Sequence, residues 1–324
     1  MRRLPIDTRV PMVPSVVPSF KVHTLGEVTD YNHDLMNVPA AWRITRGEGV
    51  KVAILDTGIP NHRDLKVAGG TSFVPGYSED EAGHGTFCGG IIAATADNGT
   101  GIKGIAPACE DYYAAVLDKY GSGSTKALVD GIYWAVDEVH AQVVNMSLGI
   151  PANYYVDPAL EEACLYAVGK GSCLFAAAGN DADDVNFPAR LETVIAVAAV
   201  DRKQRLADFS SRGPEVEFAA GGVDVFSTFL HNTYASMSGT SFACPAVAAV
   251  GVLIQSQHRK RHGRFMNQDE LRAELKKIAY DVGPVGRDEE FGWGIPVFTK
   301  DPRTPAKPKV QSFWRRLWNR IKIG

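Results

Sequence analysis

Short apolar runs recur along the chain, and each of them ends in turn residues. Continuous apolar runs are typical of strands in a parallel sheet that helices cover on both faces. The five clearest runs are VKVAILDTG, YYAAVLD, VVNMSLG, CLFAAAGN and VIAVAAV, and helical patterns fall at 84–96, 125–139, 157–170, 241–258 and 268–279. This alternation predicts an α/β fold, doubly wound and three-layered (α/β/α), with a mostly parallel central sheet. In such folds the ligand site lies at the carboxyl ends of the strands.

The two ends of the chain depart from this pattern. Prolines at positions 5, 11, 14 and 18 space the N-terminal segment, and the linker DPRTPAKPK precedes a short basic segment at the C-terminus. We therefore expect three parts: an N-terminal extension at 1–28, one folded domain at 29–299, and a linker with a C-terminal helix at 300–324.

Composition indicates an ordinary soluble protein. The 324 residues are 45% apolar and 22% charged, which is too apolar for a disordered chain. The N-terminus has no continuous apolar core of a signal peptide, and no run of eighteen apolar residues occurs. The five cysteines are odd in number and contain no C-x-x-C pair, which favours free thiols in a reducing compartment. We expect a cytoplasmic protein.

Positive charge is concentrated in the C-terminal tail. Residues 302–324 carry seven Lys or Arg and no acid, whereas the chain as a whole has a net charge of −3. The rest of the chain is therefore acidic and has no basic surface of the kind that binds nucleic acid. Wound as a helix, SFWRRLWNRIKI separates apolar from basic positions. Such a helix binds an anionic membrane surface or an acidic protein, and the alternative is that it docks on the protein's own acidic body.

The stretch SMSGTSFACPAVAAV places a serine near the start of a helix. Pro245 is expected in the first helical turn, where its missing N–H is not needed, and Ser241 then lies at the N-terminal end. Free N–H groups and the helix dipole favour negative charge there, which suits a nucleophile. A serine that only caps the helix is the alternative.

Three further polar residues lie at strand ends or helix starts of the same predicted sheet. Asp56 closes the strand VAILD, His84 begins a helix between two glycines, and Asn180 ends CLFAAAGN. Each alone reads as an ordinary turn or helix-start residue. With Ser241 they supply an acid, a base, an amide donor for an oxyanion and a nucleophile.

These stretches resemble the subtilisin-like serine proteases (subtilases), through AILDTG, GHGTFCGG, AAAGN and SGTSFACP in that order. The resemblance covers roughly residues 29–297. It implies that Ser241 attacks the peptide carbonyl, that His84 carries the proton, that Asp56 fixes the histidine tautomer, and that Asn180 binds the oxyanion with the Ser241 N–H. Three neighbouring positions depart from the family: Phe87 replaces a histidine, and Phe242 and Ala246 replace a methionine and a histidine.

The resemblance also implies how a polypeptide substrate is bound. Two backbone segments would sandwich an extended peptide through main-chain hydrogen bonds, and a third would form a wall of the first side-chain pocket, so that specificity is broad. The three segments are Gly121, Ser122, Gly123; Ser147, Leu148, Gly149; and Ala177, Ala178, Gly179. The far end of the pocket falls in DADDVNFPA, where Asp183 or Asp184 either favours a basic side chain or is a solvated loop acid.

A calcium site is implied by the same resemblance. Asp64 matches an aspartate that joins the calcium loop, and either Asp97 or Asn98 supplies a side-chain oxygen. The implied ligands are Asp64, Thr95, Asp97, Asn98, Thr100 and Ile102. The loop also contains a formal G-x-G-x-x-G, but this follows a helix and meets Pro107 at once, which disfavours a dinucleotide.

Other functions remain as alternatives to a serine endopeptidase. Cys88 and Cys244 each lie one helical turn after a catalytic candidate, but small buried residues explain both better than a thiol nucleophile does. A catalytically silent binding module would need a broken triad, and none of the four candidate positions departs from the family pattern. The oligomeric state is not indicated by the sequence.

The N-terminal extension suggests a brake on such an enzyme. Only about 28 residues precede the expected domain, too few for a folded pro-domain. Intracellular subtilisins, which this organisation resembles most, lay a short proline-containing extension across the cleft, and Arg3-Leu4-Pro5-Ile6 is loosely similar to their motif. The prolines keep the segment extended, and a disordered tail is the alternative.

Overall fold

A computed structural model describes residues 6–13, 20–22 and 26–298, with only the backbone of residues 20 and 21. The expected C-terminal helix, the whole linker before it, and Pro5, Pro14 and Pro18 lie outside the described residues.

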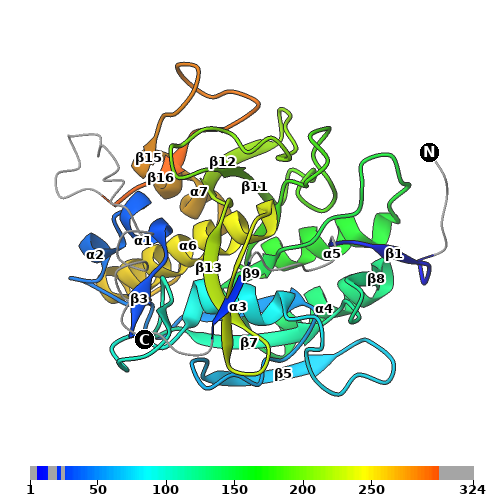
Figure 1. Ribbon diagram of the computed structural model, residues 1–324. Coiled ribbons are helices and arrows are strands. Elements are labelled where there is room, and N and C mark those ends of the chain that lie inside the picture. The colour runs from blue at the N-terminus through cyan, green and yellow to red at the C-terminus, as the bar shows by residue number, and fades with distance from the viewer. Residues whose placement is uncertain (1–5, 14–19, 23–25, 299–324) are drawn as a thin grey trace.

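Seven parallel strands form the central sheet in the order β12-β11-β10-β9-β4-β7-β5 (Figure 1). Their bounds are β4 Lys51–Asp56, β5 Val67–Ser72, β7 Glu110–Ala115, β9 Val143–Met146, β10 Cys173–Ala177, β11 Ile195–Val200 and β12 Val216–Gly221. All five apolar runs contribute a strand to this sheet, so the predicted parallel sheet is confirmed. The chain order reverses between β4 and β9, and the carboxyl ends of strands at such a point are where ligands bind in this architecture.

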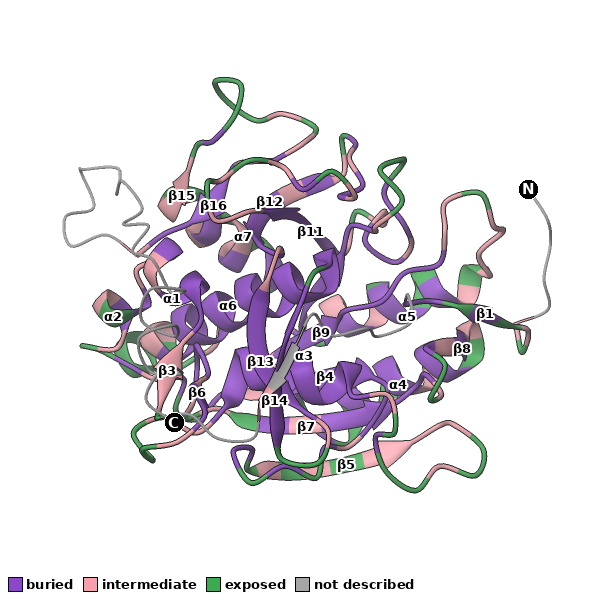
Figure 2. Cartoon of the chain, viewed as in Figure 1, coloured by how far each residue is buried: buried purple, intermediate pink, exposed green. Residues whose placement is uncertain are grey.

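Helices cover both faces of the sheet and confirm the three-layer prediction. On one face α3 (His84–Ala93) packs against α6 (Thr240–His262), and on the other α4 (Thr125–Asp137) packs against α5 (Pro158–Gly169). The remaining helices are α1 (Tyr31–Leu35), α2 (Val38–Ala41) and α7 (Gln268–Ile278). Figure 2 shows that α3, the central strands and most of α6, from Thr240 to Ser256, are buried. Of the described helices, α6 alone is long and apolar enough to span a membrane, but 94% of its apolar window is buried inside the protein, as in the core helix of a soluble domain.

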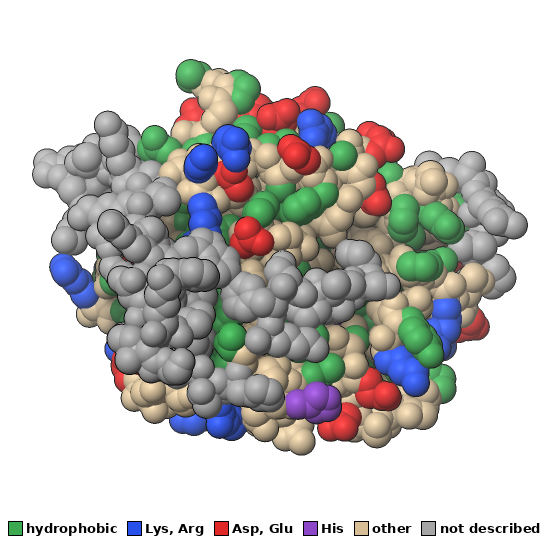
Figure 3. Space-filling model, in the orientation of Figure 1, with side chains coloured by type: hydrophobic (Ala, Val, Ile, Leu, Met, Phe, Trp, Pro, Cys, Tyr) green, Lys and Arg blue, Asp and Glu red, His purple; other side chains and the backbone are tan. Residues whose placement is uncertain are grey.

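Several strands were not predicted. β13 (Val225–Phe229) and β14 (Thr233–Met237) form a buried antiparallel hairpin that packs on α3, and β2 (Phe20–Val22) extends it. The short pairs are β3 (Val28–Thr29) with β6 (Ile102–Lys103), β15 (Ala279–Tyr280) with β16 (Ile295–Pro296), and β1 (Arg9–Pro11) with β8 (Ser122–Ser124). Acidic and basic side chains are interspersed over the described part of the face in Figure 3, with no broad area of positive charge.

The position of Pro245 differs from the prediction. Helix α6 begins at Thr240, so Pro245 lies in the second turn and removes the N–H that would bond the carbonyl of Ser241. The thiol of Cys88 on α3 donates to that carbonyl instead, at 3.5 Å. The proline therefore frees an acceptor that a neighbouring helix satisfies.

Candidate active site

Asp56 and His84 are brought together where strand β4 ends and helix α3 begins. Nδ1 of His84 lies 2.8 and 3.0 Å from the two carboxylate oxygens of Asp56, which is fully buried. An ionised carboxylate only accepts hydrogen bonds, so Nδ1 carries the proton and Nε2 keeps its lone pair. The backbone N–H of Thr57 donates to the same carboxylate at 2.7 Å. This arrangement leaves the outer nitrogen of the imidazole free to accept a proton.

Ser241 is the second residue of helix α6, and the ring of the next residue, Phe242, lies 5.4 Å from the His84 ring. The first N–H groups of a helix have no partner within it. Here the N–H of Thr240 donates to the Asn180 side chain and that of Phe242 donates to Gly239, while the described contacts give the N–H of Ser241 no acceptor. A free N–H beside a hydroxyl suits the binding of an anion formed at that hydroxyl.

The side-chain amide of Asn180 has a defined orientation. Its Oδ1 accepts from the backbone N–H of Thr240 at 2.8 Å and from the Thr240 hydroxyl at 3.0 Å. Because both partners are placed to donate, the oxygen faces α6 and the NH₂ group is left to donate elsewhere. Asn180 and Ser241 line the same pocket, of about 260 Å³.

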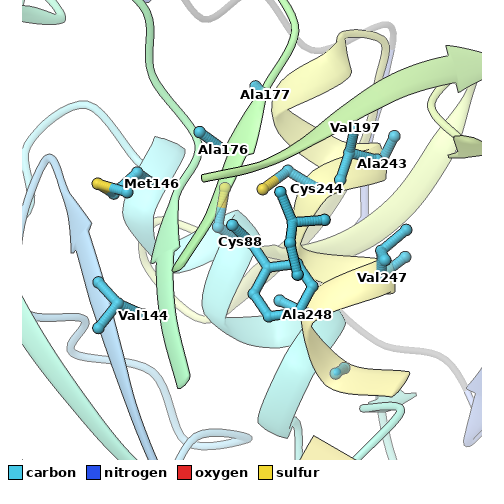
Figure 4. Close-up of a cluster of buried hydrophobic side chains, with 14 of the residues drawn as sticks. Cys88, Val144, Met146, Ala176, Ala177, Val197, Ala243, Cys244, Val247 and Ala248 are labelled. Carbon is cyan, nitrogen blue, oxygen red and sulfur yellow. The ribbon is translucent and has the colours of Figure 1, made fainter. Parts of the chain in front are cut away.

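Two buried cysteines lie behind the catalytic candidates. The sulfur of Cys88 is 3.9 Å from Nδ1 of His84, and Cys244 donates to Asn145 at 3.3 Å. Their side chains turn toward each other between α3 and α6 (Figure 4). Burial raises the pKa of both thiols well above the ordinary value, so both stay protonated and the geometry disfavours a thiolate nucleophile.

The aromatic departures from the family pattern pack against each other. Phe87 on α3 and Phe242 on α6 have ring centroids 4.5 Å apart, and Phe242 lies 5.4 Å from the His84 ring. Both phenylalanines are buried. They fill the interface between the two helices that carry the candidate base and nucleophile.

Part of the N-terminal extension lies in a cleft between two of the segments expected to bind substrate, at 121–123 and 147–149, since it bonds both. The third segment, at 177–179, lines the pocket beside Ser241 together with Leu148 and Gly149. Strand β1 pairs antiparallel with β8, with Val10 opposite Gly123 and Pro11 opposite Ser122. The N–H groups of Met12 and Val13 donate to the carbonyl of Gly121, and the N–H of Gly149 donates to the carbonyl of Met12 at 2.8 Å.

Contacts of the side chains fit the same arrangement. Val10, Met12 and Val13 are at most 8% exposed, so residues 9–13 are docked on the surface and not merely near it. Gly121 has a positive φ of 72°, and a Cβ there would lie 2.4 Å from the Val13 side chain. Only glycine at this position leaves room for Val13.

Asp181 and Asn186, from the stretch expected at the far end of the pocket, line the pocket beside Ser241. The Asn186 side chain lies between the two walls, since a Cβ on Gly149 or Gly179 would come within 3.0 Å of it. Its Nδ2 donates to Asp181 at 3.0 Å. Asp183 and Asp184, which the sequence suggested for this place, are exposed and do not line the pocket, and Asp184 pairs with Arg190.

The implied calcium ligands are partly gathered around Asp64. This carboxylate is fully buried, and it accepts from Nδ2 of Asn98 at 2.6 Å, from the N–H of Ile102 at 3.1 Å and from the Tyr234 hydroxyl at 3.3 Å. Burial raises the pKa of Asp64, and the nearby charge of Glu27 raises it further. Calcium prefers oxygen ligands, which the carboxylates of Asp64 and Glu27 offer. The Asn98 side chain turns its NH₂ group to Asp64 and its oxygen to the N–H of Thr100, so it would fit the ion only after its amide rotates.

The other implied ligands are placed less directly. Asp97 is exposed and bonds Arg46 and Lys103 at 2.5 Å each, so Asn98, and not Asp97, is the loop side chain that meets Asp64. Thr95 and Thr100 use their N–H groups, on the Asp64 carbonyl and the Asn98 side chain respectively. A Cβ on Gly101 would lie 2.2 Å from the Asp64 carboxylate, so the loop requires glycine there.

Two residues beside the candidate site, Asp80 and Thr57, were missed from the sequence. Asp80 is buried and accepts five hydrogen bonds, one of them from the Thr57 hydroxyl. An acid a few residues before a glycine-started helix is not a recognised capping pattern, so no sequence signal distinguished it from its exposed neighbours Glu79 and Glu81.

A family model and several similar curated proteins indicate the same family. The model of the subtilase family matches residues 47–294. Similar curated proteins include the minor extracellular protease Epr of Bacillus subtilis (strain 168), 39% identical over 90% of this chain and 45% of Epr, and subtilisin DY of Bacillus licheniformis, 43% identical over 74% and 86%. Thermitase of Thermoactinomyces vulgaris is 40% identical over 79% of this chain and 90% of its own length. This chain spans less than half of Epr. Since the family model covers most of the chain and these relatives align with most of it, the chain belongs to the subtilase family.

Proposed function

We propose that this protein is a serine endopeptidase that hydrolyses peptide bonds through Asp56, His84 and Ser241. The observation that carries the proposal is the imidazole of His84, held by Nδ1 on both oxygens of a buried Asp56 beside the start of the helix that carries Ser241. Names of relatives in the same family, subtilisin DY and thermitase among them, agree with it.

Each residue then has one role in acyl transfer. Ser241 attacks the peptide carbonyl carbon while Nε2 of His84 takes its hydroxyl proton, and the same proton passes to the leaving amine as the C–N bond breaks. Asp56 holds the tautomer and stabilises the imidazolium. The oxyanion accepts from Nδ2 of Asn180 and from the N–H of Ser241. Water repeats the sequence to release the acyl group from Ser241.

Covalent labelling tests this proposal. A phosphonofluoridate should label Ser241 of the full chain, and casein cleavage should fall to background in Ser241→Ala. Replacement of His84 by alanine should abolish both labelling and cleavage, because the three residues act as one unit. A Ser241→Ala protein that cleaves casein near the wild-type rate would refute the proposal.

The proposed substrates are extended polypeptides of varied sequence. The cleft segments Gly121–Gly123 and Ser147–Gly149 offer backbone groups, which every peptide can bond in the manner of an added strand. Side-chain selection is then left mainly to the pocket that Asn186 lines.

We further propose that residues 9–13 inhibit the enzyme by occupying this cleft. The support is their strand pairing with β8 and the bond from Gly149 to Met12, which use the groups that would bind a substrate. Covalent attachment places the segment at an effective concentration near millimolar, so that even weak docking competes with substrate. The motif suggested by the sequence, Arg3 to Ile6, lies before this docked stretch, and its first three residues are outside the described chain.

Calcium is the proposed structural ion. Asp64 and Asn98 would hold it together with backbone carbonyls of the loop at 95–102, and Glu27 lies nearby. When bound, it would neutralise a buried carboxylate and fasten the loop, without a part in the reaction.

The proposed location is the cytoplasm. All five cysteines lie among the described residues and none forms a disulfide, as expected in a reducing compartment. One relative, Epr, is named an extracellular protease, so cell fractionation with an antibody is the deciding measurement.

For the C-terminal segment, the proposed partner is an anionic membrane surface or an acidic protein. This proposal rests on the pattern of SFWRRLWNRIKI alone. Deletion of 302–324 should abolish co-sedimentation with anionic vesicles.

A further inference from the structure

Helix α3, which carries His84, begins without a side-chain cap of its own. Its N-cap residue is Gly83, with a φ of 82° and no capping side chain. Glycine is needed because a Cβ there would lie 2.6 Å from the Phe229 ring and 2.9 Å from Leu230. The first N–H groups of a buried helix must still find acceptors, so another residue has to supply them.

The carboxylate of Asp80 supplies one of these acceptors, for Thr86, and also binds the turn that leads into the helix. Its Oδ1 accepts from the N–H groups of Gly83 at 2.8 Å and Ala82 at 3.1 Å, and its Oδ2 accepts from the N–H of Thr86 at 2.9 Å and the Thr86 hydroxyl at 2.7 Å. Asp80 is 5% exposed. A negative charge at a helix N-terminus is also favoured by the helix dipole.

The same carboxylate is tied to the strand end that carries Asp56. The hydroxyl of Thr57 donates to Oδ1 of Asp80 at 2.9 Å and accepts from the N–H of Gly85 at 2.9 Å. The N–H of Thr57 donates to Asp56. Thr57 therefore bonds Asp56 directly. It is also linked to the helix that carries His84, once through Gly85 and once through Asp80.

Helix and strand end are in close contact at this point. A Cβ on Gly85 would lie 3.1 Å from the carbonyl oxygen of Gly58 and 3.3 Å from Cβ of Asp56. Because the helix and the strand end touch here, even a small shift of α3 along β4 would move the His84 ring relative to Asp56. The hydrogen bonds of Asp80 and Thr57 oppose such a shift.

We propose that Asp80, acting through Thr57, is a positioning residue that holds the His84 imidazole on Asp56 in the orientation needed for proton transfer. Neither residue lines the pocket beside Ser241, and neither bonds the cleft segments at 121–123 and 147–149. Their effect should therefore fall on kcat and leave substrate binding unchanged. This inference rests on the proposed peptidase function.

A matched pair at position 57 tests the proposal. Thr57→Val keeps the shape and removes the hydroxyl, whereas Thr57→Ser keeps the hydroxyl. We expect kcat on a small peptide substrate to fall roughly 10- to 100-fold in Thr57→Val with KM within about twofold, since misplacement of a catalytic group by about 1 Å costs on the order of 10²-fold. Thr57→Ser should restore kcat to within about threefold of the wild type.

Asp80 is tested by Asp80→Asn, which keeps Oδ1 but turns an NH₂ toward the N–H of Thr86. Its kcat should fall to a similar extent, and the double variant with Thr57→Val should lose less than the product of the two single losses, because both act through one bond. Glu79→Gln, an exposed neighbour in the same loop, is the control and should keep the wild-type kcat.

The outcomes are separable. Variants that melt at a lower temperature but keep the wild-type kcat would show a purely structural role and overturn the inference, as would equal losses in Thr57→Val and Thr57→Ser. Failure of Asp80→Asn to fold leaves the decision to the Thr57 pair, whose melting temperatures show whether both variants are folded. A wild-type protein that neither turns over substrate nor labels at Ser241 would instead refute the proposed function.

Discussion

Two side chains at this site, His84 and Asn180, have defined orientations. Each is fixed by a hydrogen-bond partner that can only donate or only accept. Asp56 can only accept, so the proton of His84 is on Nδ1. The N–H of Thr240 can only donate, so Oδ1 of Asn180 faces it and the NH₂ faces away. The sequence indicated which residue types gather here, but not these orientations, because they depend on partners 28 and 60 positions away.

Removal of the Asn180 amide should therefore slow the reaction without weakening substrate binding. We expect Asn180→Ala to lower kcat by roughly 10²- to 10³-fold, the range known for the oxyanion donor of a subtilisin and carried over from it. KM should change little, since the charge it stabilises arises only during the reaction. Initial rates on a peptide ester and a peptide amide check this. A kcat within threefold of the wild type would exclude Asn180 as an oxyanion donor.

A second residue-scale prediction concerns Asp111, on strand β7 between β4 and β5. It is 2% exposed, and burial raises its pKa to about 6 although the Tyr113 hydroxyl donates to it at 2.9 Å. The folded protein thus holds this proton more tightly than the unfolded chain, so the group's contribution to stability is lost as pH rises from about 4 to about 6. Above that range the ionised group costs at most roughly 3 kcal/mol.

Asp111→Asn removes this charge and keeps an acceptor for Tyr113. We expect the free energy of unfolding to rise by roughly 1 to 3 kcal/mol at pH 8 and to change little at pH 4. Urea denaturation of both proteins in a Ser241→Ala background, which prevents self-digestion, gives the two values. An equal change at both pH values would mean that ionisation is not the cause.

At the scale of elements, hydrophobic runs predicted the buried strands well and the others poorly. β4, β9, β10 and β11 are continuous apolar runs because helices cover both of their faces. Strand β5, VAGGTS, lies at the sheet edge and is not fully buried, so its composition carries little signal. The hairpin β13–β14 is buried but rich in Ser and Thr, and the hydroxyls of Ser227 and Thr228 donate to carbonyls of α3.

Strand β1 could not be predicted from its own residues. RVP is three residues long and contains a proline, which is tolerated only at a sheet edge or strand end. It becomes a strand because β8 and the segment after β9 present free backbone groups. Recognition of such an element requires knowledge of the cleft that receives it, and this comes from residues more than 100 positions away.

Weakened docking of this element should raise the activity of the full chain. Val13 is 4% exposed against Gly121, so Val13→Glu would place an unpaired charge in that contact and expel the segment. We expect a higher initial rate on a small peptide substrate, and suppression when the peptide MRRLPIDTRVPMVPSVVPSF is added in trans. Asp7→Asn, at an exposed position of the same segment, is the control. Val13→Glu with an unchanged rate would leave residues 9–13 without an inhibitory role.

At the scale of the whole molecule, the N-terminal extension is fastened to the body at distant points. β1 joins β8, β2 joins the hairpin at β14, and β3 joins β6 in the loop of the proposed calcium site. At that last point the N–H of Val28 donates to Gly101, and Glu27 accepts from Asn98. The proposed ion would therefore lie where the extension enters the domain, so its binding would couple the loop to the fold as a whole.

Calcium should accordingly raise the melting temperature, because an ion that binds only the folded state stabilises it by about 2.7 kcal/mol at a concentration 100 times its Kd. For a domain of this size the shift should be about 5 °C. Asp64→Asn should abolish the shift and Asp97→Asn should keep it, since Asp64 is buried in the loop and Asp97 bonds Arg46 and Lys103 at the surface. The effect should also weaken on acidification, because burial raises the pKa of Asp64 and calcium must then compete with a proton. Calorimetry of the Ser241→Ala background in millimolar calcium and in excess chelator measures each shift; equal melting temperatures in the two conditions would remove the ion from this loop.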